Sequence, residues 1–174
     1  AKESAREIVY EIFSLYSKKT TSRSFSYEKD NDLDGVLSSS FSFVETPDQK
    51  KAFQDVFEDM NGETPMDRLV SGDVGFGKTE VAIRAMFKAF LSNKVSALLC
   101  PTTILADQHF ITCKERLSQF GVSISLLSRF KTKKEQSETI SLIKQGKIDV
   151  LIGTHRLLSK DVEISNLGLL VIDE

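Results

Sequence analysis

Apolar residues along the chain follow two spacings, one typical of amphipathic helices and one typical of buried strands. A repeat of i, i+3, i+4 predicts helices over 3–19, 47–60, 78–92, 104–118 and 133–145. Short apolar runs predict strands near 67–71, 95–100, 122–127, 148–152 and 168–172, with a short helical turn before the last of them. Because several of these runs are apolar throughout, they indicate a parallel sheet covered by helices on both faces. The pattern therefore predicts an α/β fold.

Polar segments divide the chain into three parts. Residues 1–19 form an amphipathic N-terminal helix, and 20–42 have linker composition, with Ser and Thr followed by the acidic run EKDNDLD. We expect regular structure to resume at Thr46, where T-P-D-Q offers an N-cap, a proline at the first helical position and a capping glutamine. Residues 43–174 then form the α/β unit.

Composition narrows the class of protein. The chain has 174 residues, 40% hydrophobic, with a net charge of −2, which fits one core and argues against a broadly basic surface for nucleic acid, although not against a local basic strip. Cys100 and Cys113 form no C-x-x-C pair, so we expect reduced, buried thiols. His109 and His155 lie in separate segments without metal-ligand spacing, so no zinc site is expected. With no long apolar run and no signal peptide, we expect no membrane contact and a cytoplasmic location.

The run GDVGFGKT at 72–79 fits G-x-x-x-x-G-K-[ST], a loop that wraps the phosphates of a nucleotide. Glycines allow backbone N–H groups to converge on phosphate oxygens, Lys78 would reach the β and γ phosphates, and Thr79 would bind Mg²⁺. A strand candidate precedes this loop and a helix follows it, as the mechanism requires. The candidate nucleotide-binding residues here are Gly72, Asp73, Val74, Gly75, Phe76, Gly77, Lys78, Thr79 and Glu80.

Two carboxylates follow the last predicted strand. Asp173 would hold Mg²⁺ and Glu174 would polarise the attacking water, although two acids at the end of a strand also serve as a simple cap. The sequence starts without Met and stops at VIDE, directly after this strand, so we expect it to be a piece of a longer protein.

Five motifs occur in order: GDVGFGKTEVA, LLCPTTILADQH, SLLSRFKTKKEQ, GTHRLLSKD and LGLLVIDE. In order and spacing they resemble the RecG-like group of superfamily 2 helicases and translocases, and within that group the family of bacterial transcription-repair coupling factors. The resemblance is dense over 41–174 and weak before it. It implies a three-layer P-loop (RecA-like) domain, the first motor lobe, that uses ATP and Mg²⁺ with Lys78, Asp173 and Glu174 as catalytic residues.

The resemblance also implies an ATP-driven translocase on double-stranded DNA that displaces stalled RNA polymerase and couples transcription to nucleotide excision repair. RNA polymerase and the damage-recognition protein would bind elsewhere in the full-length protein. The N-terminal helix would then transmit the state of the motor, although plain packing explains its apolar stripe equally well. Two rival functions stay open, which are RecG-type fork remodelling and a nucleotide-switched interaction module. Because the arginine finger of this superfamily comes from a second lobe, we expect the isolated fragment to be inactive.

Gln49 has two possible roles. It completes a capping box with Thr46, and in the family that the motifs resemble a glutamine of this motif reads the adenine edge while a phenylalanine stacks on the ring. We predict adenine recognition by Gln49 and Thr46, with Phe41 as the stacking residue and Phe43 in the core.

Residues at three strand ends are candidates for DNA phosphate contacts. A tight strand-to-helix turn is the alternative for the first group, and a solvated surface is the alternative for the basic strip. Yet a capping box of Thr132 and Glu135 would place two lysines in the first turn of a helix, where its dipole disfavours cations, and this favours an external anion. The three groups are Pro101, Thr102 and Thr103, then Arg129, Lys133 and Lys134, then Thr154, His155 and Arg156.

Overall fold

The computed structural model of the protein describes residues 25, 27, 32–41, 43–73 and 75–173. The predicted helix 1–19 lies outside the described residues, and so do Val74 and Glu174.

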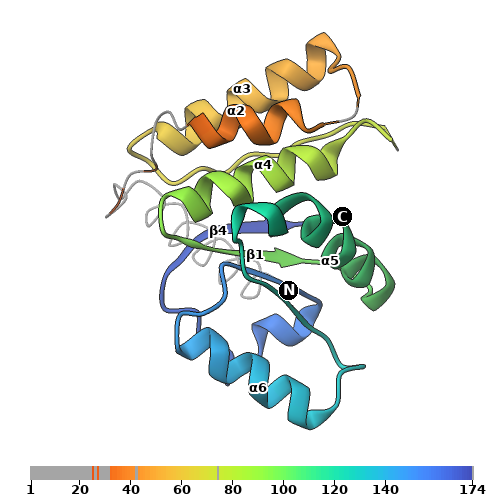
Figure 1. The fold of residues 1–174 in the computed structure, drawn as a ribbon, viewed down its shortest axis with the longest axis vertical. Coiled ribbons are helices and arrows are strands. Elements are labelled where there is room, and N and C mark those ends of the chain that lie inside the picture. The colour runs from red at the N-terminus through yellow and green to blue at the C-terminus, as the bar shows by residue number, and fades with distance from the viewer. Residues whose placement is uncertain (1–24, 26, 28–31, 42, 74, 174) are drawn as a thin grey trace, which may run out of the picture.

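Four parallel strands form the central sheet of the protein (Figure 1). They are β1 (Val95–Leu99), β2 (Ile124–Leu127), β3 (Val150–Gly153) and β4 (Leu167–Ile172), in the spatial order β2-β3-β1-β4. In the register, Leu99 lies opposite both Gly153 and Ile172. All four strands therefore end at the same edge of the sheet.

Helices cover both faces of this sheet, so the predicted three-layer α/β fold is confirmed. Successive side chains of a strand point to opposite faces. Accordingly Val150 and Ile152 join one hydrophobic cluster with α4 (Lys78–Leu91) and α5 (Thr103–Leu117), whereas Leu151 joins a second cluster with α6 (Lys133–Lys144) and the turn η2 (His155–Leu158). A further short turn, η1 (Ser118–Phe120), follows α5.

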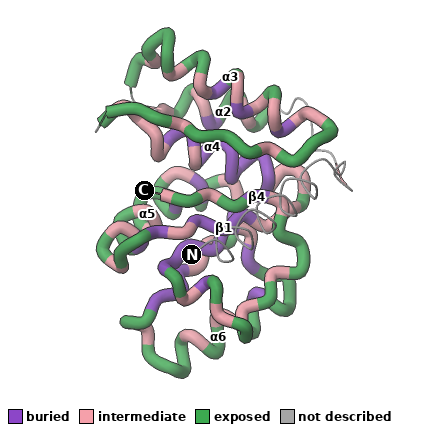
Figure 2. Tube along the Cα trace, turned by 180° about the vertical axis from the view of Figure 1, so that it is seen from behind, coloured by how far each residue is buried: buried purple, intermediate pink, exposed green. Residues whose placement is uncertain are grey.

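Two more helices, α2 (Asp32–Ser39) and α3 (Pro47–Asn61), pack over the outer side of α4. Helix α4 is therefore buried from both sides, and Met86, Phe87 and Ala89 have no exposed surface. Figure 2 shows buried residues along α4 and the sheet and exposed ones on the outer helices and turns. Within the described part of the chain, no helix is both long and apolar enough to cross a lipid bilayer.

Two sequence expectations differ from the structure. Regular structure resumes at Asp32 rather than Thr46, because Leu37 of α2 is buried against α4 although the segment is polar overall. The strand predicted near 67–71 does not form, and Leu69 is 91% exposed. A strand needs a partner for its backbone N–H and C=O groups, and none of the described strands pairs with this segment.

A buried group of charges joins the outer helices to α4 and α5. Glu80, 5% exposed, accepts a hydrogen bond at 3.0 Å from Arg84 Nε and another at 2.7 Å from Arg116 of α5. Arg84 also lies 2.6 Å from the carboxylate of Glu45 and 3.9 Å from the ring centre of Phe53. Each buried charge is thus balanced by an opposite one, as burial requires.

We predict that Glu80→Gln destabilises the fold strongly. The amide keeps the size of the side chain but leaves two arginines without their shared counter-charge, a change that costs roughly 3 kcal/mol when a buried pair is broken. Urea unfolding of this chain measures the effect. Arg68→Gln is the matched control, because the partners of Arg68, Asp55 and Asp59, lie at the surface, and it should change the midpoint little. Equal, small shifts for both variants would contradict the role of the buried network.

Candidate nucleotide site at the carboxyl edge of the sheet

The loop before α4 has the backbone shape that phosphate binding requires. Gly75 and Gly77 have φ of 83° and 87°, and Gly77 is the N-cap of α4 in the left-handed conformation. The N–H of Phe76, which lies between these two glycines, donates to the carbonyl oxygen of Asp73 at 3.1 Å. The N–H groups of Lys78 and Thr79 lie in the first turn of α4, where no preceding helical turn supplies carbonyl oxygens to accept from them. The positive end of the helix dipole is also at this point, which favours an anion.

Lys78 is held at the mouth of this loop. Its Nζ donates to the carbonyl oxygens of Gly72, at 2.5 Å, and Asp73, at 3.0 Å. The ammonium group therefore lies beside the glycine loop, within reach of the position that phosphates take in such loops. The residues present fit a nucleoside triphosphate: glycines with positive φ, a cation at the loop and the hydroxyl of Thr79 at the start of the helix.

Gln49 ties the start of α3 to the phosphate loop. Its Oε1 accepts from the N–H of Thr46 at 2.8 Å, and the hydroxyl of Thr46 accepts from the N–H of Gln49 at 3.2 Å, so the predicted capping box is confirmed. Its Nε2 donates to the carbonyl of Phe76 at 2.5 Å. Recognition of adenine by this side chain stays a prediction.

The two phenylalanines before α3 take different positions from those expected. Phe43 is 75% exposed, so its assignment to the core is wrong. Phe41 is half-buried, with the guanidinium carbons of Arg84 and Arg116 at 5.6 and 5.8 Å from its ring centre. Phe41 rather than Phe43 lies beside Arg84 and Arg116, and apolar character alone does not distinguish the two phenylalanines. Stacking of Phe41 on adenine stays a prediction.

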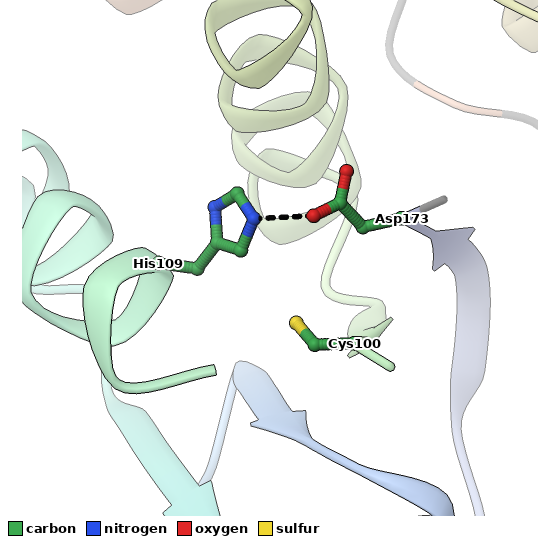
Figure 3. A group of neighbouring side chains, drawn as sticks. All are labelled: Cys100, His109 and Asp173. Carbon is green, nitrogen blue, oxygen red and sulfur yellow. Dashed lines mark hydrogen bonds and ion pairs between the residues drawn. The ribbon is translucent and has the colours of Figure 1, made fainter. Parts of the chain in front are cut away.

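Asp173 lies directly after β4, next to the end of β1. Its N–H donates to Leu99 O at 2.9 Å, which continues the sheet by one bond. Its Oδ2 is 2.7 Å from Nε2 of His109 in α5, and both side chains are half-buried. Because a carboxylate oxygen only accepts, Nε2 carries the proton. Figure 3 shows His109 and Asp173 pointing toward each other, with Cys100 beside them.

His109 is the site residue that the sequence analysis missed. Side-chain ligand atoms of Cys100, His109 and Asp173 all lie within 4.8 Å of one another, although Asp173 is distant from the other two in the sequence. The separation of 2.7 Å between Nε2 and Oδ2 is a hydrogen-bond length. Burial, and then the charge of Asp173, raises the pKa of the Cys100 thiol to about 11, so it stays protonated at neutral pH. The group is therefore a hydrogen-bonded pair beside a neutral thiol.

Glu80 differs from the other candidates in the phosphate loop. Its carboxylate is bonded to Arg84 and Arg116, as described above, and its N–H donates to Gly77 O at 2.9 Å. The structure thus gives this side chain a role in the buried charge network.

The candidate nucleic-acid contacts fall into accessible and inaccessible groups. Pro101 and Thr102 are exposed, Thr103 is half-exposed, and the Thr102 hydroxyl caps α5 by accepting from the N–H of Leu105 at 3.2 Å. His155 is exposed, whereas Thr154 is only 2% exposed. A phosphate could therefore reach the start of α5 directly, but could not reach the hydroxyl of Thr154 without a rearrangement.

The guanidinium of Arg156 already has hydrogen-bond partners within the protein. Its guanidinium makes two hydrogen bonds to Asp161, at 2.8 and 2.7 Å, and a third to Gln136 at 3.0 Å. The hydrogen bonds to Asp161 raise the pKa of Arg156, and the same bonds lower the pKa of Asp161. Contact between Arg156 and a phosphate would have to compete with this pair.

The basic strip lies around the start of α6. Arg129, Lys133 and Lys134 are all exposed, and the predicted capping box is confirmed, with Glu135 N–H donating to the Thr132 hydroxyl at 3.2 Å. The hydrogen bonds from Thr132 also lower the pKa of Glu135. Two lysines thus occupy the first turn of a helix, where the dipole disfavours them.

The fold and the loop define a P-loop motor domain of the helicase class. The chain matches the family model of the DEAD/DEAH box helicases over residues 46–174 and belongs to that family. It is 50% identical over 171 residues to the transcription-repair-coupling factor of Bacillus subtilis (strain 168), a match that covers 98% of this chain and 14% of that protein. The factor of the same name from Borreliella burgdorferi is 48% identical over 174 residues, which is 100% of this chain and 16% of the relative.

A solved structure supports the same relationship. The chain superimposes on the structure of RecG bound to a three-way DNA junction with a TM-score of 0.85 and 37% sequence identity, over 92% of this chain and 22% of that one. The resemblance to the RecG-like group and to the coupling factors is therefore confirmed. The chain spans only 14 to 16% of the length of the Bacillus subtilis and Borreliella burgdorferi coupling factors.

We predict that both cysteines react slowly in the folded protein. Burial raises the pKa of Cys100 to about 11 and that of Cys113 to about 12, so at pH 8 roughly one Cys100 thiol in a thousand is the reactive thiolate. Iodoacetamide labelling followed by mass spectrometry should give rates far below those in urea. Unfolded thiols ionise near pH 8.5. The contribution of the protonated thiols to the free energy of unfolding should therefore be fully present below that pH and fall as pH rises toward 11. Labelling of the native protein at the unfolded rate would contradict this prediction.

Proposed function

We propose that this chain is the ATP-binding motor lobe of a translocase on double-stranded DNA that displaces stalled RNA polymerase and couples transcription to nucleotide excision repair. The observation that carries the proposal is the phosphate loop with Lys78 at its mouth, at the edge of a parallel sheet where β4 also delivers Asp173. Figure 1 shows the start of α4 and the carboxyl end of β4 on the same side of the molecule. The names of the coupling-factor relatives support the cellular role and, with it, a location in the bacterial cytoplasm.

ATP and Mg²⁺ are the cofactors that these residues would hold. The backbone of Gly72 to Gly77 would surround the phosphates, and Lys78 would balance the charge on the β and γ phosphates. Thr79 and Asp173 would hold Mg²⁺, which supplies charge stabilisation when bound. Glu174 would orient the attacking water, while Gln49, Thr46 and Phe41 would recognise the base.

Duplex DNA would bind along the same edge of the sheet. The segment Pro101–Thr103 follows β1 and would contact phosphates through backbone N–H groups and hydroxyls. His155 is also exposed, and it follows β3, the strand next to β1. The strip of Arg129, Lys133 and Lys134 would add charge. RNA polymerase and the damage-recognition protein would bind to parts of the complete natural protein outside this chain.

RecG-type fork remodelling is the second candidate function. The structural match to RecG favours it, but the identity of 37% is lower than the 50% shared with the Bacillus subtilis coupling factor. A nucleotide-switched interaction module is the third, and DNA stimulation of the ATPase separates it from both motors.

We predict that Lys78→Ala abolishes DNA-stimulated ATP hydrolysis in the complete natural protein. Removing the ammonium withdraws the charge that faces the transferred phosphoryl group, so kcat should fall at least about a hundredfold. This chain alone should hydrolyse ATP negligibly, because a second lobe supplies the arginine finger. Steady-state phosphate release with and without duplex DNA measures both. Hydrolysis that ignores duplex DNA in the unaltered protein would favour the switch over the motor.

We predict that replacing Arg129, Lys133 and Lys134 by Gln weakens duplex binding and flattens its salt dependence. Each lost phosphate contact removes about 0.9 from the slope of log K against log salt, so the slope should fall by roughly 2 to 3. Fluorescence anisotropy over a salt series measures it. Lys50→Gln with Lys51→Gln, two exposed lysines on α3, is the control. An equal slope in both variants would assign the strip to an ordinary solvated surface.

A further inference from the structure

Helix α5 connects two parts of the proposed site. It begins at the end of β1, where Thr102 caps it beside the candidate DNA contacts Pro101 and Thr103. About 9 Å along its axis, at 1.5 Å per residue, it carries His109, whose ring meets Asp173 at the end of the neighbouring strand. One rigid element therefore spans from the proposed nucleic-acid contact to the proposed magnesium ligand.

The contact between His109 and Asp173 controls the direction of the carboxylate. The backbone of Asp173 is held by the hydrogen bond from its N–H to Leu99 O at 2.9 Å. The side chain can still rotate, and its Oδ2 is held by His109 Nε2 at 2.7 Å. With 13% and 27% of the two side chains exposed, water competes only partly for this bond. Hydrogen bonds to an ionised group are strong and depend on alignment.

No comparable connection joins the other described candidate contacts to Asp173. The guanidinium of Arg156 is directed at Asp161 and Gln136. Arg129 and the two lysines lie around the start of α6, which packs on β2, and the sheet order places β2 and β4 at opposite edges. Within the described structure, α5 is thus the direct link between the two parts of the site.

We propose that His109 is a positioning residue that couples DNA contact at Pro101–Thr103 to the orientation of Asp173 and so to ATP hydrolysis. This inference rests on the proposed function and adds how DNA contact would regulate ATP hydrolysis. Because α5 moves as a unit, a small displacement of its first turn by a bound phosphate shifts the ring of His109 against the carboxylate. A shift of a few tenths of an ångström is enough to change a bond of this length and alignment.

The test compares His109→Leu with His109→Gln in the complete natural protein. Leucine removes the donor, whereas the Nε2 of glutamine can take the place of the imidazole Nε2. We expect His109→Leu to lower the ratio of DNA-stimulated to basal kcat about tenfold, with KM for ATP changed less than about twofold. His109→Gln should restore most of the ratio. The Mg²⁺ concentration that half-saturates binding of a fluorescent ATP analogue should rise for leucine and return for glutamine.

Controls distinguish failure of this inference from a folding defect and from failure of the proposed function. Thr112→Ala changes an exposed position one turn further along α5, whose hydroxyl donates to Gln108 O of the same helix at 3.0 Å, and should leave every value unchanged. Retention of full DNA stimulation and of the Mg²⁺ midpoint in His109→Leu would overturn the inference alone. An equal loss in the leucine and glutamine variants would also overturn it, because it indicates packing. Absence of stimulation in the unaltered protein would instead overturn the proposed function.

Discussion

Pairing of β1 with β4 is the constraint on which the candidate site depends. The register sets Leu99 opposite Ile172, so the next residues along each strand, Cys100 and Asp173, come together at the edge of the sheet. Since every strand is parallel, the segments that follow them leave at that same edge. A shift of one residue in this register would turn Asp173 to the opposite face and remove it from His109.

Layering explains why charged groups are buried so close to this edge. Helix α4 starts at the phosphate loop and is covered by the sheet on one side and by α2 and α3 on the other. A helix covered on both sides can keep charged residues only when they are paired. Glu80, one residue after the proposed magnesium ligand Thr79, meets that requirement through Arg84 and Arg116.

Local patterns were sufficient for most elements and insufficient for contacts between distant residues. The apolar runs around Val150 and Leu169 predicted strands correctly, and the motifs at Thr46 and Thr132 predicted both capping boxes, because each depends on a few neighbouring residues. The segment 67–71 offers only Leu69 and Val70 between polar residues, and a strand also needs a partner that sequence periodicity does not reveal. Likewise, 64 residues separate His109 from Asp173, so the absence of ligand spacing gave no hint of their contact.

The contacts around the start of α3 link a residue proposed to recognise the base with the phosphate loop. Gln49 donates to the carbonyl of Phe76 in the phosphate loop, while Glu45 and Phe41 both meet Arg84 of the helix that follows this loop. Gln49, one of the residues proposed to recognise the base, is therefore hydrogen-bonded to the loop proposed to hold the phosphates. The carboxamide of Gln49 carries a second N–H and a second acceptor position, so a base placed beside it would share this side chain with the phosphate loop.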